Sequence, residues 1–430
     1  MNATTELVLG MFLLVGCSVL VGELFARMGQ AALVGQLLVG IILGPTFLAG
    51  YLGFDSLSAE FSALQFLATF FILMMAGLSI TPQQIRATGV AATLLGIAIF
   101  IIPFLLGAGL VRVLYPDLPP IEDLFIALTI SITALPVLGI MLRDLGLLDS
   151  KFGTFLMSSA MVNELAAITT FAVLLQIYAN PNAVGFAIAT SVVTVAMFLT
   201  SILAVYFAVQ ALRQRRVWER WAERFRTTWR TREAGFAILM VFGLGAALYS
   251  QALGLTYLVG AFYCGILITP DTAGRREHRS ITYIFEAITW GFFIPLFFAL
   301  VGFNMNLRDI GLAAVPILAF LGLAFFAIFS KLFVGSAVSK SLGWSSDESL
   351  AAGFLVVSRG AVELAIALLL LEEGIFSTAI FTVVAGVGLV TTFVAPIGAR
   401  PFVRVLLGRP PPPTLTGADT SLPSVGTVRR

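Results

Sequence analysis

Glu164 is the residue of this sequence whose position most clearly indicates chemistry. It lies near the midpoint of residues 151–178, a helix-length apolar run with no other acid, and Asn163 precedes it. At 1.5 Å rise per residue the carboxylate is about 20 Å from either end, which is the middle of a bilayer if the run spans one. An ionisable group there costs about 3 kcal/mol and is by default a hypothesis of function. The alternative is a buried acid that only fixes helix packing.

Three further charged residues lie well away from the ends of apolar runs. Lys331 has no charged neighbour in AFFAIFSKLFVGSAV and needs a counter-ion or a deprotonated state, and Glu164 is its candidate partner. Arg359 and Glu363 are four residues apart, the spacing at which a continuous helix pairs charges on one face. A purely structural ion pair is the competing interpretation for these two. The four charges sum to zero, so binding a monovalent cation requires compensation, which the loss of a proton would supply.

Two apolar runs are interrupted by helix-breaking residues at matching places in the two halves of the chain. The first break is SITALP at 131–136, and the second is SRGAVE at 358–363. Pro136 removes a backbone donor and clashes with the preceding turn. Interrupted helices at matching positions are typical of transporter sites, because half-helix ends offer backbone dipoles to an ion. A proline kink with a packing glycine is the simpler alternative for each break.

The elements that must position these residues are membrane spans, as the composition indicates. Of the 430 residues, 59% are hydrophobic and 11% are charged, whereas a soluble domain carries about 25% charged residues. The mean hydropathy is +1.01. One His and two Cys, Cys17 and Cys264, exclude a Cys/His metal cluster and imply no disulfide framework. The predicted environment is the lipid bilayer, with no bound cofactor and no nucleic-acid partner.

About thirteen apolar runs reach spanning length, so the predicted fold is an all-α integral membrane protein. The first run is expected to be a retained span and not a signal peptide, because it opens with Glu6, lacks a basic segment and shows no small-residue cleavage pattern. The runs are residues 5–26, 31–49, 59–79, 86–114, 122–145, 151–178, 183–211, 233–252, 254–270, 280–303, 310–339, 347–372 and 375–407.

The distribution of basic residues predicts the orientation. Of the 25 Lys and Arg residues, all except Arg112, Arg308, Lys331 and Arg359 fall in segments on one side of the runs. By the positive-inside rule that side is cytoplasmic. The protein is therefore expected in the cell (inner) membrane, with its N-terminus outside and its C-terminus in the cytoplasm.

A basic segment divides the runs that follow the first one into two sets of six. In this segment, about 212–232, three of the five tryptophans recur with Phe225 at spacings of three and four, which predicts an amphipathic helix on the cytoplasmic interface. A solvated basic loop is the alternative. The even split predicts inverted six-helix repeats at about 31–211 and 233–407.

The predicted domain boundaries follow from this division. Residues 1–409 form one transmembrane domain. The Pro/Ser/Gly-rich residues 410–430 are expected to be a disordered cytoplasmic tail, with no soluble regulatory domain after the membrane part.

Several segments occur in the order and spacing of one transporter family. They are VGQLLVGIILGP, SITALPVLGIMLRDLGLLDSKFG with MSSAMVNELAAI, LVGAFYCGIL, FFIPLFFALVGFNMNL, and SKLFVGSAVSKSLGW with GFLVVSRGAVELAIA. From about residue 10 to 407 the chain therefore resembles the second family of monovalent cation:proton antiporters. That family includes bacterial sodium/proton and Kef-type potassium exchangers and plant cation/proton exchangers.

The resemblance implies a thirteen-span inverted-repeat fold and a homodimer. A dimerisation domain would be separated from a core transport domain at roughly 86–178 and 310–407, where the two interrupted spans cross. The family's ion-binding carboxylate falls on Glu164, its preceding Asn on Asn163 and its buried lysine on Lys331. Thr133 matches a position that helps line the ion site. Relatives usually have Asp where this chain has Glu164, so ion selectivity does not carry over.

The function that these residues predict is secondary active antiport of Na⁺ or K⁺ against H⁺, and not an enzymatic reaction. Glu164 would hold either a proton or the cation while the core domain carries it between the two faces, which would serve pH homeostasis. Oxygen ligands suit an alkali cation. The candidates beside Glu164 are freed backbone carbonyls, the amide oxygen of Asn163 and the hydroxyls of Ser131 and Thr133.

Two other transport functions are considered. A sodium-coupled symporter of an organic anion would need a roomier polar cavity. A Kef-like potassium efflux channel or carrier would be gated by a separate regulatory subunit. A hydrolase is disfavoured, since the sequence has no GxSxG motif, no paired catalytic aspartates and no His within a span.

Overall fold

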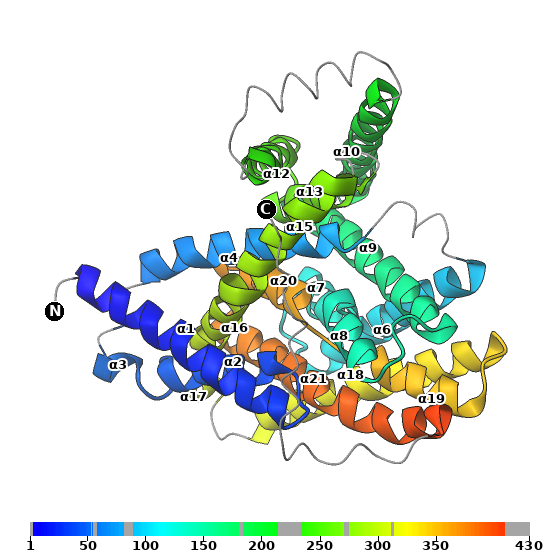
Figure 1. The fold of residues 1–430 in the computed structure, drawn as a ribbon. Coiled ribbons are helices and arrows are strands. Elements are labelled where there is room, and N and C mark those ends of the chain that lie inside the picture. The colour runs from blue at the N-terminus through cyan, green and yellow to red at the C-terminus, as the bar shows by residue number, and fades with distance from the viewer. Residues whose placement is uncertain are drawn as a thin grey trace, which may run out of the picture.

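The protein is a bundle of helices whose composition and lengths suit a membrane (Figure 1). The computed structural model describes residues 3–52, 54, 58–80, 89–179, 184–213, 234–270, 275–310 and 314–408, and no strand occurs among them. In this part of the chain ten helical segments are long and apolar enough to cross a membrane, and α2 (Ala32–Leu43) and α13 (Tyr257–Leu267) are shorter apolar helices. The predicted all-α membrane class is confirmed.

Helix occurs within each of the thirteen predicted runs. The predicted tail lies outside the described residues, and so does the amphipathic helix expected at 212–232, apart from two residues that extend α10. Besides α2 and α13, the helices are α1 (Ala3–Arg27), α3 (Ala49–Leu52), α4 (Ser58–Leu78), α6 (Val90–Leu114), α7 (Pro120–Ser131), α8 (Leu135–Asp144), α9 (Lys151–Ala179), α10 (Val184–Arg213), α12 (Ala234–Ala252), α15 (Arg275–Ile288), α16 (Ile294–Asn304), α17 (Leu307–Ile310), α18 (Ala314–Ser341), α19 (Ser346–Leu355), α20 (Ala361–Glu372) and α21 (Thr378–Leu407).

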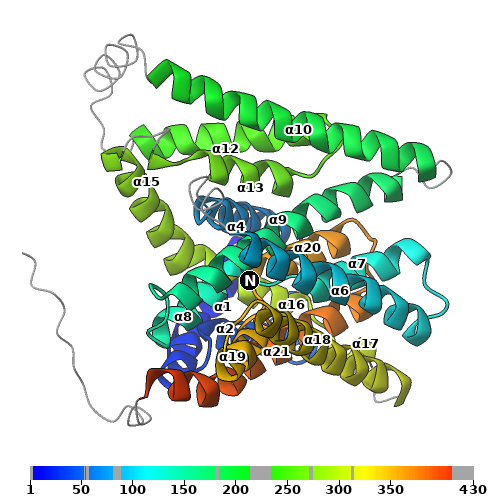
Figure 2. The same cartoon turned by 90° about the vertical axis from the view of Figure 1, so that its right-hand side faces the viewer.

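Packing sorts most helices into two sets. In the α4 group, which is α1, α2, α4, α12, α13 and α16, α2 packs against α1 and α16, and α13 packs against α4 and α12. In the α9 group, which is α6 to α9 and α18 to α21, α6 packs against α7, α9 and α18, and α19 packs against α18 and α21. Helix α10 contacts both α9 and α13, and its course past α13 can be followed in Figure 2. The α9 group falls in the ranges predicted for a core domain, whose role in transport stays a prediction.

Facing glycines bring helices of the α4 group into close contact. A Cβ atom on Gly40 of α2 would collide with the carbonyl of Ala299 in α16, and one on Gly302 of α16 would collide with the carbonyl of Leu37. The same arrangement joins α4 to α13 at Gly77 and Gly265. Small residues let helix backbones approach closely in a membrane, where association depends on van der Waals packing. These contacts tie the α4 group together.

Both predicted helix breaks are present, and each separates two short helices. Residues 132–134 are non-helical between α7 and α8, and residues 356–360 leave the helical path between α19 and α20. Pro136 lies in the first turn of α8. In that position its missing N–H would be unpaired anyway, so it starts the second half-helix and does not kink a continuous one.

A π-helical turn joins α15 to α16 at Thr289–Phe293, which the sequence patterns did not predict. Pro295 is in the first turn of α16. In a continuous α-helix the proline ring would clash with the carbonyl four residues earlier, that of Gly291. The wider turn relieves this clash, since its closing bond runs from the N–H of Ile294 to the carbonyl of Thr289.

The α2–α16 contact yields a stability prediction. Gly40→Ala places a methyl group against the carbonyl of Ala299 and is expected to lower the free energy of unfolding by about 1–3 kcal/mol. Gly109→Ala in α6 is the matched control, because nothing lies within 4 Å of the added atom. The control is expected to be neutral or slightly stabilising, since Ala favours helix over Gly. Melting curves in one detergent check this, and equal melting temperatures would contradict it.

Candidate ion-binding site

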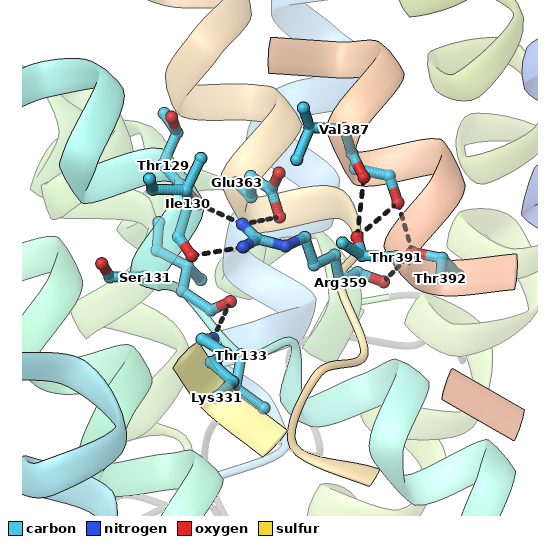
Figure 3. Close-up of polar contacts among 12 residues, drawn as sticks. Thr129, Ile130, Ser131, Thr133, Lys331, Arg359, Glu363, Val387, Thr391 and Thr392 are labelled. Atoms are coloured by element: carbon cyan, nitrogen blue, oxygen red, sulfur yellow. Dashed lines mark hydrogen bonds and ion pairs between the residues drawn. The ribbon is translucent and has the colours of Figure 1, made fainter. Parts of the chain in front are cut away.

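The carbonyl end of α7 is capped by two buried cations from the second half of the chain (Figure 3). The ammonium of Lys331 in α18 donates to the carbonyl of Ile132 at 2.5 Å and to the Thr133 hydroxyl at 2.7 Å. The guanidinium of Arg359 donates to the carbonyl of Thr129 at 2.6 Å and to that of Ile130. The last carbonyls of a helix have no partner within the helix. Both positive charges also suit the negative end of the helix dipole.

Asn163 of α9 holds the unwound segment after α7. Its side-chain oxygen accepts the N–H of Thr133 at 2.7 Å, and its side-chain nitrogen donates to the carbonyl of Ser131 at 3.1 Å. The amide thus satisfies one donor and one acceptor that the interruption frees. Asn163 is fully buried, so water does not compete for these two bonds.

The two interrupted segments cross and bond to each other. The N–H of Ala134 donates to the carbonyl of Ser358 at 3.3 Å, and the Thr133 hydroxyl donates to the carbonyl of Val356 at 2.9 Å. The crossing expected from the family resemblance is therefore present. The two unwound segments, 131–134 and 356–359, therefore provide hydrogen-bond partners to each other. The hydrocarbon core of a membrane provides none.

Arg359 and Glu363 form an ion pair, although not on one continuous helix. The nitrogen Nη1 of Arg359 lies 3.3 Å from Oε2 of Glu363, and both side chains are buried. Helix α20 begins only at Ala361, so Glu363 occupies its first turn while Arg359 belongs to the unwound segment. The pairing predicted from sequence spacing is observed. Glu363 also suits the positive N-terminal end of α20.

Glu164 lies in the middle of α9, fully buried, and has no polar partner among the described residues. Neither of its carboxylate oxygens makes a hydrogen bond. The expected pairing of Glu164 with Lys331 is wrong in this conformation, because the ammonium of Lys331 is directed at the Ile132 carbonyl and the Thr133 hydroxyl. The sequence identifies buried charges but not the backbone carbonyls that an interrupted helix offers as alternative partners.

The other oxygens proposed as ion ligands are already engaged. Thr133 Oγ1 both donates to Val356 and accepts from Lys331, and the Asn163 oxygen accepts from the Thr133 amide. The Ser131 hydroxyl donates to the carbonyl of Ala127 within α7 at 2.7 Å. The geometry therefore brings Ser131, Thr133, Asn163 and Lys331 together.

A cleft of about 340 Å³ lies between the α4 group and the α9 group. Its inner walls include Pro136 of α8 and Ala361 of α20, the first turns of the two half-helices that follow the breaks. Its polar lining includes Gln36, Asp144 and Arg400.

Sequence reasoning missed several groups of the site, most of them backbone carbonyls. The hydroxyl of Thr392 in α21 donates to the carbonyl of Arg359 at 3.1 Å. This bond joins the second unwound segment to α21. In the sequence, only the two adjacent threonines at 391 and 392 inside an apolar run could have indicated this contact. The roles of the Thr129, Ile130 and Val356 carbonyls cannot be predicted from residue types, because every residue has a backbone carbonyl.

Comparisons with known proteins identify a transporter family and a similar fold. The family model described as "Sodium/hydrogen exchanger, transmembrane" matches residues 12–405. The chain is 25% identical to the Na⁺/H⁺-K⁺ antiporter GerN of Bacillus cereus over 88% of this chain and 91% of that protein. It is 28% identical to the Na⁺/H⁺ antiporter NhaS4 of Synechocystis over 91% and 96%. The fold is similar to that of the sodium proton antiporter MjNhaP1 of Methanocaldococcus jannaschii, with a TM-score of 0.71 and 14% identity over 95% of this chain and 100% of that one.

The Arg359–Glu363 pair yields a second prediction. Arg359→Met leaves Glu363 and two carbonyls without a partner, and we expect it to cost about 3–5 kcal/mol of stability. Glu363→Gln should cost less, because Arg359 keeps its carbonyl partners. Thermal melting in detergent measures both losses.

The control for this prediction is Arg27→Met, which removes an exposed ion pair of the same spacing with Glu23 and should cost less than about 1 kcal/mol. Equal losses for Arg359→Met and Arg27→Met would contradict a structural role for Arg359.

Proposed function

This chain belongs to the sodium/hydrogen exchanger family and is a cation/proton antiporter, and we propose that it exchanges Na⁺ or K⁺ for H⁺ at one buried carboxylate, that of Glu164. The family is one of transporters and not of enzymes. Relatives named for sodium and for potassium exchange both match the chain, which supports a monovalent cation as the cargo.

One observation carries the proposal. Glu164 is buried in an apolar helix with both carboxylate oxygens unpartnered. The two other buried acids among the described residues are paired, Glu363 with Arg359 and Asp123 with Arg112. A buried carboxylate without a partner is costly, and either a proton or a cation relieves that cost. Because the two ligands use the same oxygens, one must leave before the other binds. Exchange follows from this competition.

Lys331 supplies a second element of the proposed mechanism. Its ammonium sits 2.5 Å from one carbonyl oxygen and 2.7 Å from one hydroxyl oxygen of the unwound segment. Oxygens of this kind are the ligands that alkali cations take. The charged lysine and a bound cation would therefore compete for the oxygens of Ile132 and Thr133. A cation would bind when Lys331 withdraws or loses its proton.

Alternating access is proposed to occur by an elevator-like movement of the α9 group against the α4 group. The cleft between the two groups supports this, since it reaches the first turns of α8 and α20 beside the helix crossing. Lining residues of the cleft such as Arg400 lie in segments that the positive-inside rule would place in the cytoplasm. We also propose that two copies of the chain form a homodimer, in which the α4 group of one copy contacts the other copy.

Substitution of Glu164 tests the proposed exchange. In proteoliposomes, Glu164→Gln should abolish cation-dependent dissipation of a pH gradient, because a neutral amide neither exchanges a proton nor attracts a cation. Glu164→Asp should retain part of the activity. Glu286→Gln removes an exposed acid and serves as the control. The assay adds Li⁺, Na⁺, K⁺ and Rb⁺ in turn, and wild-type exchange by the Gln variant would refute the mechanism.

Substitution of Lys331 tests the competition. In Lys331→Gln the Ile132 and Thr133 oxygens no longer hold a positive charge, so the apparent KM for the cation should fall by at least threefold. The dependence of exchange on pH should also change. Lys340→Gln, on the same helix and bonded to Ser346 at the surface, is the control. If Lys331→Gln has an unaltered KM and pH profile, the competition is refuted and this lysine has only a structural role.

A further inference from the structure

Three polar side chains link the α4 group to the α9 group at a place remote from the ion site. Gln65 of α4 donates from its side-chain nitrogen to the carboxylate of Glu372 at the end of α20. Asn304 of α16 donates to the Gln65 side-chain oxygen at 2.9 Å and to the carbonyl of Leu300 in its own helix at 2.9 Å. Because Asn304 occupies the oxygen of the Gln65 amide, the nitrogen of that amide faces Glu372.

These residues belong to helices that also line the cleft, but they lie away from it along each helix. The cleft is lined by Ile72 on α4, Phe298 on α16 and Ala361 on α20. At 1.5 Å per residue, Gln65 is about 10 Å along α4 from the cleft wall, and Glu372 is about 16 Å along α20 from it. Helices α4, α16 and α20 therefore line the cleft at one place along their length and are joined by hydrogen bonds at another.

Only one bond of this cluster crosses between the two groups. Gln65 and Asn304 both belong to the α4 group, in which α4 packs against α16. Gln65 is 4% exposed, so its amide is held in place by its surroundings. Glu372 lies at the surface and is the single member contributed by the α9 group. Separation of the two groups at this end requires the Gln65–Glu372 bond to break and leaves the Asn304–Gln65 bond intact.

We propose that Gln65, Asn304 and Glu372 form the gate on the side of the membrane away from the cleft. The gate is closed in this conformation and opens when the ion site becomes accessible from that side. Gln65 and Asn304 are its fixed half, and Glu372 is its moving half. The inference rests on the alternating access of the proposed function, to which it adds the contact that must be made and broken in each cycle.

Cross-linking across the gate is the main test. Gln65→Cys with Glu372→Cys, in a background with Cys17→Ala and Cys264→Ala, is treated with a short bifunctional thiol reagent in proteoliposomes. We expect at least tenfold loss of exchange relative to the same protein before treatment, and recovery after a cleavable link is reduced. Gln65→Cys with Asn304→Cys joins two residues of one group, and its treatment should leave most of the rate. Full exchange by the linked Gln65–Glu372 pair would overturn the gate.

Accessibility of a buried position gives a readout that does not depend on transport. Ala68 follows Gln65 by three residues on α4 and is fully buried. In the same cysteine-free background, Ala68→Cys should react at least threefold faster with a membrane-impermeant thiol reagent when Gln65→Leu is added. Glu373→Gln removes the neighbouring exposed charge and should not change the rate. Equal labelling rates in all three proteins would overturn the gate.

The two proposals fail in different ways. Absence of cation-dependent exchange by the wild-type protein would count against the proposed function, while the labelling of Ala68→Cys would still decide on the gate. Full exchange by the linked protein would count against the gate alone.

Discussion

The site depends on one constraint, that the backbone of an interrupted helix inside a membrane must find its hydrogen-bond partners within the protein. The carbonyl end of α7 and the unwound residues after it meet this constraint with the ammonium of Lys331, the guanidinium of Arg359 and the amide of Asn163. Lys331 and Asn163 come from other helices, and Arg359 comes from the second unwound segment. The break therefore holds α9, α18 and the α19–α20 segment around itself, and removal of any one of these side chains leaves buried polar groups without partners.

The same constraint explains how the buried charges are distributed. Both cations are used on helix ends, and one of them also neutralises Glu363. Glu164 has no partner for either carboxylate oxygen, although it follows Asn163 directly on α9. The hydrogen bonds at this break do not use Glu164, the carboxylate that we propose binds the transported proton or cation. A site that must release its ligand in every cycle is expected to have such a group.

Sequence patterns predicted the membrane class, the two interruptions and the central position of Glu164, because these depend on apolar run length and on the residues SITALP and SRGAVE. The crossing of the two interrupted segments was expected only from the family resemblance. The partner of Lys331 was predicted wrongly, since pairing rules consider charged side chains and the partners are backbone carbonyls. The roles of Gln65 and Thr392 were not predicted either. Their contacts join residues 307 and 33 positions apart in the chain, and single polar residues in apolar runs do not identify such partners.

The π turn at Thr289–Phe293 has a consequence for the register of the helices that it joins. Such a turn holds one residue more than an α-helical turn, so α15 and α16 are offset by one position, which amounts to a rotation of about 100°. With this offset, Gly302 faces α2. The deletion of a single residue within the turn would direct a different face of α16 at Gly40. Homologous chains that differ by one residue in this segment would therefore need a different set of small residues along α16.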